Sequence, residues 1–216
     1  MNLLVSDFDG TFFDNNYKNN IKFIKKTHNI DFVIATGRNF SSLKQDLKIK
    51  CKYYICNDGG YVLDSNYNLL YKNTINPKTI KIIYDRIKKL EYDEYFFDNI
   101  KCISKNILNN VNKVSIKIKG NIPNNDIKYL IDGLTDVYAY VSTNWININS
   151  IESKKSKAID FILNLNKYDK IYVIGNDIND VDMIKKYNGY FIDKKENSKF
   201  NILNSFLELE SKIKND

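Results

Sequence analysis

Two carboxylates near the start of the chain stand where they could act together. Asp7 and Asp9 follow the apolar segment Leu3-Leu4-Val5 and are followed by Gly10 and Thr11. Strand side chains alternate between faces, so carboxylates two residues apart at a strand end point the same way. Gly10 lets the chain turn sharply and brings backbone N–H groups near whatever the carboxylates hold. An ordinary surface turn uses the same residue types, but the pattern favours magnesium-assisted phosphoryl chemistry.

Two later apolar segments end in polar residues that suit the same chemistry. Residues 31–35 lead into Thr36-Gly37-Arg38, whose hydroxyl and guanidinium groups could bind phosphate. Residues 170–174 lead into the polar segment 175–180, and a helical pattern begins near Lys155. The strand ends of an open parallel sheet gather at one carboxyl edge, where ligands bind. We therefore expect a single site at that edge.

The order of these motifs resembles the haloacid dehalogenase superfamily and, within it, the Cof-type phosphatases. The chain carries D-x-D-G-T at 7–11, T-G-R at 36–38, K-x-x-A at 155–158 and G-x-x-x-N-D at 175–180. Cys56-Asn57-Asp58-Gly59-Gly60 also resembles the family's turn after the next core strand. The resemblance implies an α/β fold, with a Rossmann-like parallel-sheet core and an inserted α+β cap domain.

The resemblance also implies a role for each matching residue. Asp7 matches the nucleophile that becomes an aspartyl phosphate, and Asp9 matches the general acid and base. Thr36 and Lys155 match the groups that hold the phosphoryl oxygens, with Lys155 offsetting repulsion between the substrate and the nucleophile. The other expected substrate-binding positions are Gly10, Thr11, Gly37, Arg38 and Asn179.

Magnesium is the cofactor that the resemblance implies, with Asp7, the backbone carbonyl of Asp9 and a residue of the last motif as ligands. That motif departs from the family, because Asn176 stands where an aspartate is usual. An amide oxygen still ligates Mg²⁺, but without negative charge, so we expect weaker metal binding. Asp177 could replace Asn176 as the ligand if the loop shifts, and Asp180 matches a position that binds metal-bound water and orients the loop.

The middle of the chain changes pattern and is the expected cap. We expect a catalytic core of residues 1–73 and 151–216 and an inserted cap of residues 74–150. Helical periodicity covers Lys78 to Leu90 and Asn125 to Leu134, and strand-like runs cover 95–97, 114–118, 137–141 and 145–148. The core helices are expected over 20–26 and 40–48, with a hairpin over 61–71. Candidate cap contacts to substrate are Lys113, Lys117, Tyr138, Asn144 and Trp145. Asp58 replaces an asparagine that is more usual in the family, in a loop expected to border the substrate, and so bears on specificity.

Composition narrows the class of protein. A chain of 216 residues with 43% hydrophobic content can bury a good core and suits one domain plus an insertion. Neither a membrane-spanning apolar run nor a leader sequence is evident, so we expect a cytoplasmic protein. Cys51, Cys56 and Cys102 lack metal-site spacing and are expected to be buried free thiols. The net charge of +7 is spread along the chain, which argues against a dedicated nucleic-acid site.

These observations together predict a magnesium-dependent phosphatase that acts on a small phosphomonoester, such as a sugar phosphate. A phosphomutase of the same superfamily, similar to phosphomannomutases, would retain the aspartyl phosphate but return the phosphoryl group to a sugar. A metabolite-binding protein with weakened catalysis is the alternative from another class, and Asn176 is the feature that supports it. The sequence leaves the substrate and the oligomeric state open.

Overall fold

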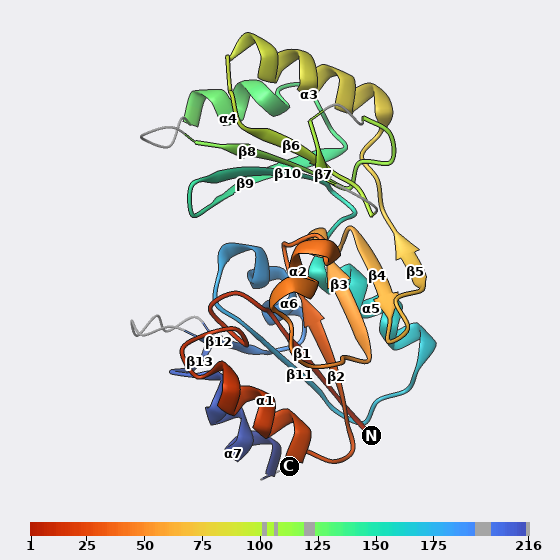
Figure 1. Cartoon of the computed structure of the whole chain (residues 1–216), viewed down its shortest axis with the longest axis vertical. Coiled ribbons are helices and arrows are strands. Elements are labelled where there is room, and N and C mark those ends of the chain that lie inside the picture. Colours follow the sequence, from red (N-terminus) through yellow and green to blue (C-terminus); the bar gives the residue numbers. More distant parts are fainter. Residues whose placement is uncertain (101–102, 106–107, 119–123, 193–199, 215–216) are drawn as a thin grey trace.

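The apolar segments from both ends of the chain assemble into one eight-stranded sheet (Figure 1). The computed structural model describes residues 1–100, 103–105, 108–118, 124–192 and 200–214. The strand order is β13-β12-β11-β1-β2-β3-β4-β5, parallel from β13 to β3 and antiparallel for the hairpin β4-β5. The strands are β1 (Asn2–Ser6), β2 (Ile30–Ala35), β3 (Tyr53–Cys56), β4 (Tyr61–Asp64), β5 (Leu69–Lys72), β11 (Ile171–Gly175), β12 (Tyr190–Ile192) and β13 (Asn201–Leu203).

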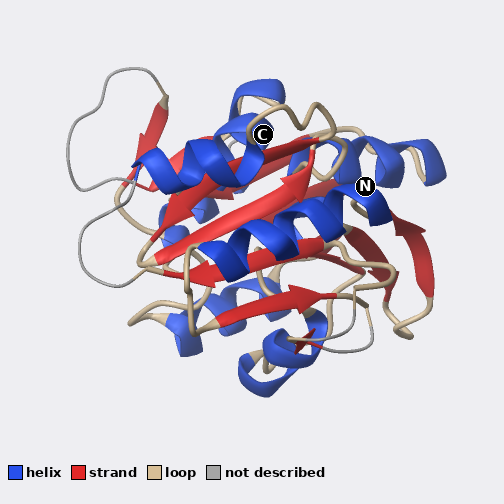
Figure 2. Ribbon diagram, turned by 90° about the horizontal axis from the view of Figure 1, so that it is seen from above, coloured by secondary structure: helices blue, strands red, loops and turns tan. Residues whose placement is uncertain are grey.

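Helices cover both faces of this sheet because its central strands are apolar on both faces (Figure 2). Leu4 of β1 packs into a cluster with α1, α2 and α7, whereas Leu3 and Val5 pack into the opposite cluster with α5 and α6. The helices are α1 (Tyr17–Lys26), α2 (Phe40–Asp46), α5 (Lys155–Leu165), α6 (Val181–Lys186) and α7 (Leu209–Lys214). This part of the chain also contains three short 3-10 helices, η1 (Asn57–Gly59), η2 (Ile178–Asp180) and η3 (Phe206–Glu208).

A second, five-stranded antiparallel sheet lies over the carboxyl edge of the first (Figure 1). Its strand order is β7-β6-β8-β10-β9, and α3 and α4 cover the face that points away from the first sheet. Ile80, Ile83 and Ile87 of α3 bury one helix face against this sheet, as their helical spacing predicts. The elements are α3 (Pro77–Lys89), β6 (Tyr95–Asp98), β7 (Ile103–Ser104), β8 (Lys113–Lys117), α4 (Asn124–Ile131), β9 (Val137–Ser142) and β10 (Trp145–Ser150).

The structure confirms the predicted fold class. The parallel sheet draws its strands from residues 2–72 and 171–203, and the second sheet from residues 95–150. The predicted boundaries were wrong at some helix ends, since α1 begins at Tyr17, α2 ends at Asp46 and α4 ends at Ile131. Helix ends carry little apolar periodicity, so the spacing of apolar residues predicts the first and last residues of a helix poorly.

The cysteines and the lengths of the helices can also be described. Cys51 and Cys56 are buried free thiols, as predicted, while Cys102 lies outside the described residues. In the described part of the chain, no helix has both the length and the apolarity needed to cross a membrane.

The turn after β3 depends on Gly59. This residue has a φ of +92°, and a Cβ at this position would lie 2.3 Å from the backbone carbonyl oxygen of Lys154. The turn therefore packs directly against the residue that precedes Lys155. Gly133 also has a positive φ, +68°, but a Cβ there would meet nothing within 4 Å.

Gly59→Ala should therefore destabilise the protein far more than Gly133→Ala. The left-handed backbone costs about 1–2 kcal/mol for alanine at either position, and only at Gly59 does a backbone clash add roughly 1–3 kcal/mol. Denaturant unfolding of the two variants measures the difference. Equal losses in the free energy of unfolding would show that the contact with Lys154 does not restrict this turn.

Candidate active site

Four neighbouring strands deliver the predicted site residues to one edge. β11, β1, β2 and β3 are adjacent and parallel, and each ends in one of the polar motifs. Asp7 follows β1, Thr36 follows β2, Asp58 follows β3 and Asn176 follows β11. The expectation of one site at the carboxyl edge of the parallel sheet agrees with this topology.

A buried ion cluster lies at the centre of the edge. Lys155 Nζ lies 2.8 Å from Asp7 Oδ1 and 2.6 Å from Asp180 Oδ1, and the Lys155 side chain has no exposed surface. Burial and the neighbouring Asp180 raise the pKa of Asp7, while Lys155 opposes this shift. Burial alone would lower the pKa of Lys155, but the two carboxylates raise it. With both carboxylates ionised, the cluster carries one net negative charge, which favours a further cation.

Asn176 is the residue through which such a cation would be held. Asn176 Oδ1 lies 3.0 Å from the carbonyl oxygen of Asp9 and 3.2 Å from Asp7 Oδ2. The Thr11 hydroxyl donates to Asn176 Oδ1 over 3.0 Å. A Cβ at Gly10 would lie 2.4 Å from the Asn176 amide nitrogen, so only glycine permits this approach.

This donor set fits Mg²⁺. Oxygen ligands at about 2.1 Å in an octahedron lie about 3 Å from one another, which is the spacing between the Asn176 oxygen and its two oxygen neighbours. A reversed amide would instead donate its NH₂ group to Asp9 O and Asp7 Oδ2. Asn176 can therefore present an oxygen to a metal or, without metal, satisfy the same acceptors itself.

The other acidic residues of the last motif have different partners. Asp180 Oδ2 accepts the backbone N–H groups of Asn176 and Asp177, which holds this loop against the ion cluster. Asp177 accepts the backbone N–H of Ile178 and the hydroxyl of Ser142 from the second sheet. Within the described residues, no three His, Cys, Asp or Glu side chains gather as a metal site. Asp177 thus faces the second sheet, and the geometry favours Asn176 as the ligand.

Arg38 has partners that the sequence did not suggest. Its Nε donates to Asp9 Oδ2 over 2.8 Å and its second terminal nitrogen donates to Asp9 Oδ1, while Nη1 donates to Asp46 over 2.6 Å. The guanidinium also lies over the rings of Phe8 and Phe13. Arg38 therefore orients Asp9 in this structure, although the sequence assigned it to phosphate.

Thr36 and Gly37 directly precede Arg38 in the chain. Thr36 is buried, and its hydroxyl accepts the backbone N–H of Arg38 over 3.1 Å. The carbonyl of Gly37 accepts a hydrogen bond from Lys113 of β8.

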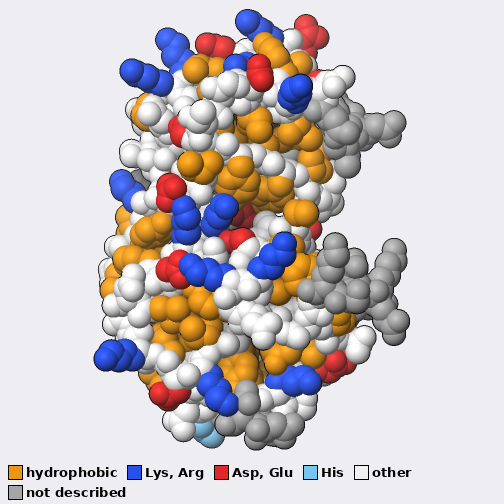
Figure 3. Space-filling view, turned by 180° about the vertical axis from the view of Figure 1, so that it is seen from behind, with side chains coloured by type: hydrophobic (Ala, Val, Ile, Leu, Met, Phe, Trp, Pro, Cys, Tyr) orange, Lys and Arg blue, Asp and Glu red, His pale blue; other side chains and the backbone are white. Residues whose placement is uncertain are grey.

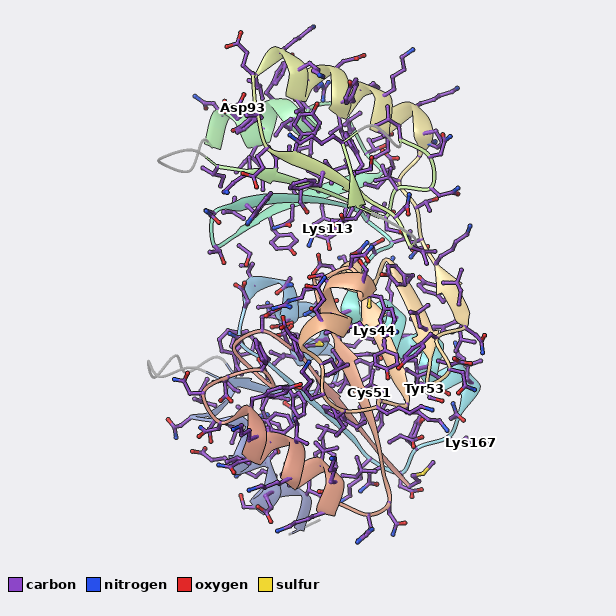
Figure 4. All side chains as sticks on the ribbon, in the orientation of Figure 1. Lys44, Cys51, Tyr53, Asp93, Lys113 and Lys167 are labelled. Carbon is purple, nitrogen blue, oxygen red and sulfur yellow. The ribbon has the colours of Figure 1, made fainter. Side chains whose placement is uncertain are left out.

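Asp58 joins the two sheets. Its Oδ2 accepts hydrogen bonds from Lys113 Nζ and from the Tyr140 hydroxyl, each over 2.8 Å. Asn179 donates to its other oxygen over 2.8 Å. Figure 4 shows Lys113 on the second sheet, at the level between the two sheets. Asp58 itself is buried and acts as a structural link, while its partners Lys113, Tyr140 and Asn179 are close enough to the cavity to be affected by this position.

A cavity of about 660 Å³ lies between the sheets. From behind, acidic and basic side chains lie side by side along this level of the surface (Figure 3). Its first-sheet wall is formed by Asp7, Asp9, Gly37, Arg38, Asn39, Ser42, Asp177 and Asn179. Its second-sheet wall is formed by Phe96, Asp98, Lys113, Ser115, Tyr140, Ser142, Thr143, Trp145 and Asn147.

Only two of the five cap contacts named from the sequence line this cavity, Lys113 and Trp145. Lys117 pairs with Glu94, Tyr138 donates to the carbonyl of Ser153, and Asn144 does not line the cavity. The residues that sequence reasoning missed, such as Phe96 and Asp98, occupy alternate strand positions. The alternation of side chains between the two faces of each predicted strand could have identified them.

Replacing Asp58 by Asn should destabilise the protein in a pH-dependent way. Burial would raise the pKa of Asp58, but Lys113 and Lys155 outweigh it and lower the pKa to about 2. The ionised carboxylate therefore stabilises the fold above about pH 4, and this contribution is lost as the pH falls from about 4 to 2. Asp58→Asn leaves Lys113 buried without its counter-charge, and we expect a loss of about 3–5 kcal/mol at pH 7.

Denaturant unfolding between pH 2.5 and 7 measures this effect, with Asp132→Asn on the exposed surface of the cap as the matched control. The gap between wild type and Asp58→Asn should narrow at the acid end. A gap that stays constant over this range would contradict the assigned pKa shift.

Asn176→Asp should enlarge the stabilising effect of magnesium. With chelator, a third carboxylate beside Asp7 and Asp180 should lower the free energy of unfolding by at least about 1 kcal/mol relative to wild type. With Mg²⁺, the same carboxylate binds the cation more strongly, so the melting temperature of the variant should rise more than that of wild type.

Thermal unfolding with chelator and with Mg²⁺ checks this expectation, and Asp177→Ala serves as the comparison. Loss of the magnesium effect in Asp177→Ala, with no gain in Asn176→Asp, would assign the ligand to Asp177 instead.

Comparisons with known proteins agree with this geometry. Residues 4–132 match the family model described as haloacid dehalogenase-like hydrolase. No curated protein sequence matches the chain. Among solved structures, a phosphatase of the haloalkanoate superfamily from Bacteroides thetaiotaomicron has a TM-score of 0.81 at 14% identity, covering 100% of this chain and 94% of that chain.

Two further structures share the fold. A haloacid dehalogenase-like hydrolase from B. subtilis has a TM-score of 0.74 at 14% identity, covering 88% of this chain and 89% of that chain. A subclass IIB sugar phosphatase has a TM-score of 0.71 at 18% identity, covering 91% and 89%. At these identities the structures show the fold alone. The family model spans more than half of the 216 residues, and the chain therefore belongs to the haloacid dehalogenase-like hydrolases.

Proposed function

We propose that this hydrolase is a magnesium-dependent phosphatase that cleaves a small phosphomonoester, such as a sugar phosphate, through an aspartyl phosphate on Asp7. The observation that carries the proposal is the Asp7 carboxylate, which lines the cavity and is bound from below by Lys155. A phosphatase and a sugar phosphatase of the same fold support this choice of reaction.

In the first step, a carboxylate oxygen of Asp7 attacks phosphorus, and the bond between phosphorus and the leaving oxygen breaks. Asp9 enters this step protonated, with its ion pair to Arg38 opened, and gives its proton to that oxygen, so the product leaves as an alcohol. Lys155 limits the repulsion between Asp7 and the incoming phosphate dianion. Covalent catalysis of this kind divides one difficult displacement into two easier ones.

In the second step, Asp9 takes a proton from water, and the water oxygen attacks the phosphorus of the aspartyl phosphate. The bond between phosphorus and Asp7 breaks, which releases inorganic phosphate, restores the Asp7 carboxylate and leaves Asp9 protonated for the next cycle. Mg²⁺, held by Asp7, the carbonyl of Asp9 and Asn176, would neutralise charge on the phosphoryl oxygens.

Residues 74–150 are proposed to act as a cap. Lys113 and Tyr140 bind Asp58, and Ser142 binds Asp177, so this segment contacts two of the loops at the edge of the first sheet. A covered cavity excludes water and suits a small metabolite better than a nucleic acid or a protein. We propose such a metabolite as the partner and the cytoplasm as the location.

A panel of phosphorylated metabolites tests the proposal. Purified protein with Mg²⁺ should release inorganic phosphate from at least one sugar or polyol phosphate, and chelator should stop the release. Interconversion of sugar phosphate isomers without release would identify a mutase. Tight binding of a metabolite without turnover would identify a binding protein.

Asp7→Asn should abolish phosphate release while the protein remains folded, because an amide is a far poorer nucleophile than a carboxylate. Asp9→Asn should slow release from a sugar phosphate by roughly 10²–10⁴-fold. With 4-nitrophenyl phosphate, whose leaving group needs little protonation, Asp9→Asn should lose much less activity. Release by Asp7→Asn at the wild-type rate would remove Asp7 from the mechanism.

A further inference from the structure

One face of the cap sheet forms a wall of the cavity. Along β6, Tyr95 and Phe97 pack under the cap helices, while Phe96 and Asp98 line the cavity. Asp98 lies opposite Lys113 on β8 in the strand register. Because strand side chains alternate, the residues on this face can meet a substrate without disturbing the cap core.

Asp98 is the unusual member of this face. Its side chain is nearly buried, with 6% of the residue exposed. Its Oδ1 is fully buried and has no hydrogen-bond partner among the residues that the structure describes. A buried carboxylate oxygen without a donor costs free energy, so a ligand that supplies a donor would be favoured there. Burial raises the pKa of Asp98 to about 6, although the positive charge of Lys113 opposes this, and the carboxylate is mostly ionised at neutral pH.

Lys113 does not donate a hydrogen bond to Asp98 Oδ1. Its ammonium group donates to Asp58 Oδ2 and to the carbonyl of Gly37. It is the only Lys or Arg on the cap wall of the cavity, counting described residues, and its charge is already paired. The cap wall therefore offers an acceptor and lacks a cation for a second anionic group.

Aromatic side chains lie next to this acceptor. The rings of Phe96 and Trp145 have centroids 6.0 Å apart and planes inclined at 40°. Both rings line the cavity, with Ser115 and Asn147 on the strands between β6 and β9. Aromatic faces pack against apolar surface, and nearby hydroxyl and amide groups fix the orientation of a polar ligand. This combination suits the C–H face and the hydroxyl edge of a sugar or polyol.

We propose that Asp98 accepts hydrogen bonds from hydroxyl groups of the leaving group and selects phosphomonoesters of neutral polyhydroxylated compounds over those with a second anionic group. The proposal rests on the proposed phosphatase function and assigns its specificity to one cap residue. Asp98 does not contact the reacting atoms in this scheme, so it acts in binding and selection.

Asp98→Asn tests the proposal, with Asp132→Asn on the exposed cap surface as the matched control. For the best sugar or polyol monophosphate of the panel, KM should rise about tenfold or more, because hydrogen bonds to a charged acceptor are replaced by weaker ones to a neutral amide, while kcat changes less. Kinetics with 4-nitrophenyl phosphate, which has no hydroxyl groups, should stay near those of wild type. The ratio of kcat/KM for a sugar bisphosphate to that for the monophosphate should rise, because a repelling charge is removed.

Wild-type protein gives a test that does not depend on folding of a variant. It should hydrolyse sugar or polyol monophosphates with higher kcat/KM than bisphosphates or phosphorylated carboxylic acids, and removing a hydroxyl from the best substrate should lower kcat/KM. A preference for doubly anionic substrates, or an unchanged KM in Asp98→Asn, would overturn the role of Asp98 and leave the phosphatase function intact. Absence of phosphate release from every substrate, 4-nitrophenyl phosphate included, would overturn both.

Discussion

A lysine with no contact to water needs counter-charges, and in this protein that requirement organises the whole edge of the sheet. Lys155 is the first residue of helix α5, and its ammonium group is held between Asp7, which follows β1, and Asp180 of η2. Removing both carboxylates would leave the buried lysine without a counter-charge, which is strongly destabilising. The same pair of contacts fixes Asp7, the proposed nucleophile, and, through the Asp180 bonds to the loop amides, fixes Asn176. Catalytic geometry and fold stability are therefore coupled at one side chain.

A second buried charge pair, Asp58 with Lys113, links the cap to the first sheet. Tyr140 and Asn179 complete the hydrogen bonds of this carboxylate. Such a pair gives little net stability compared with an apolar contact, but it restricts the relative position of the two elements that carry the charges. It holds the cap wall over the carboxylates and also neutralises the lysine that would otherwise attract a second anion into the cavity.

The sequence predicted the parallel sheet and its carboxyl edge because short apolar strands followed by polar motifs carry a strong local signal. It also predicted Asp7 and Lys155, whose surroundings then follow from the topology. It did not predict the partners of Arg38 or the buried position of Asp58, because both depend on contacts between segments far apart in the chain. It named cap residues by chemical type rather than by strand alternation, and so it did not name Asp98 among the residues that line the cavity.

The division of the cap strands into two faces has a consequence for how such enzymes diversify. On β6, β8 and β10, the residues that support the cap helices and those that meet the cavity occupy alternate positions. A substitution on the cavity face changes what the pocket recognises while the apolar layer beneath α3 and α4 stays intact. Except at Lys113, whose pair with Asp58 links the two sheets, single exchanges along these strands can thus change recognition with little folding penalty, and the chemistry at the sheet edge remains the same.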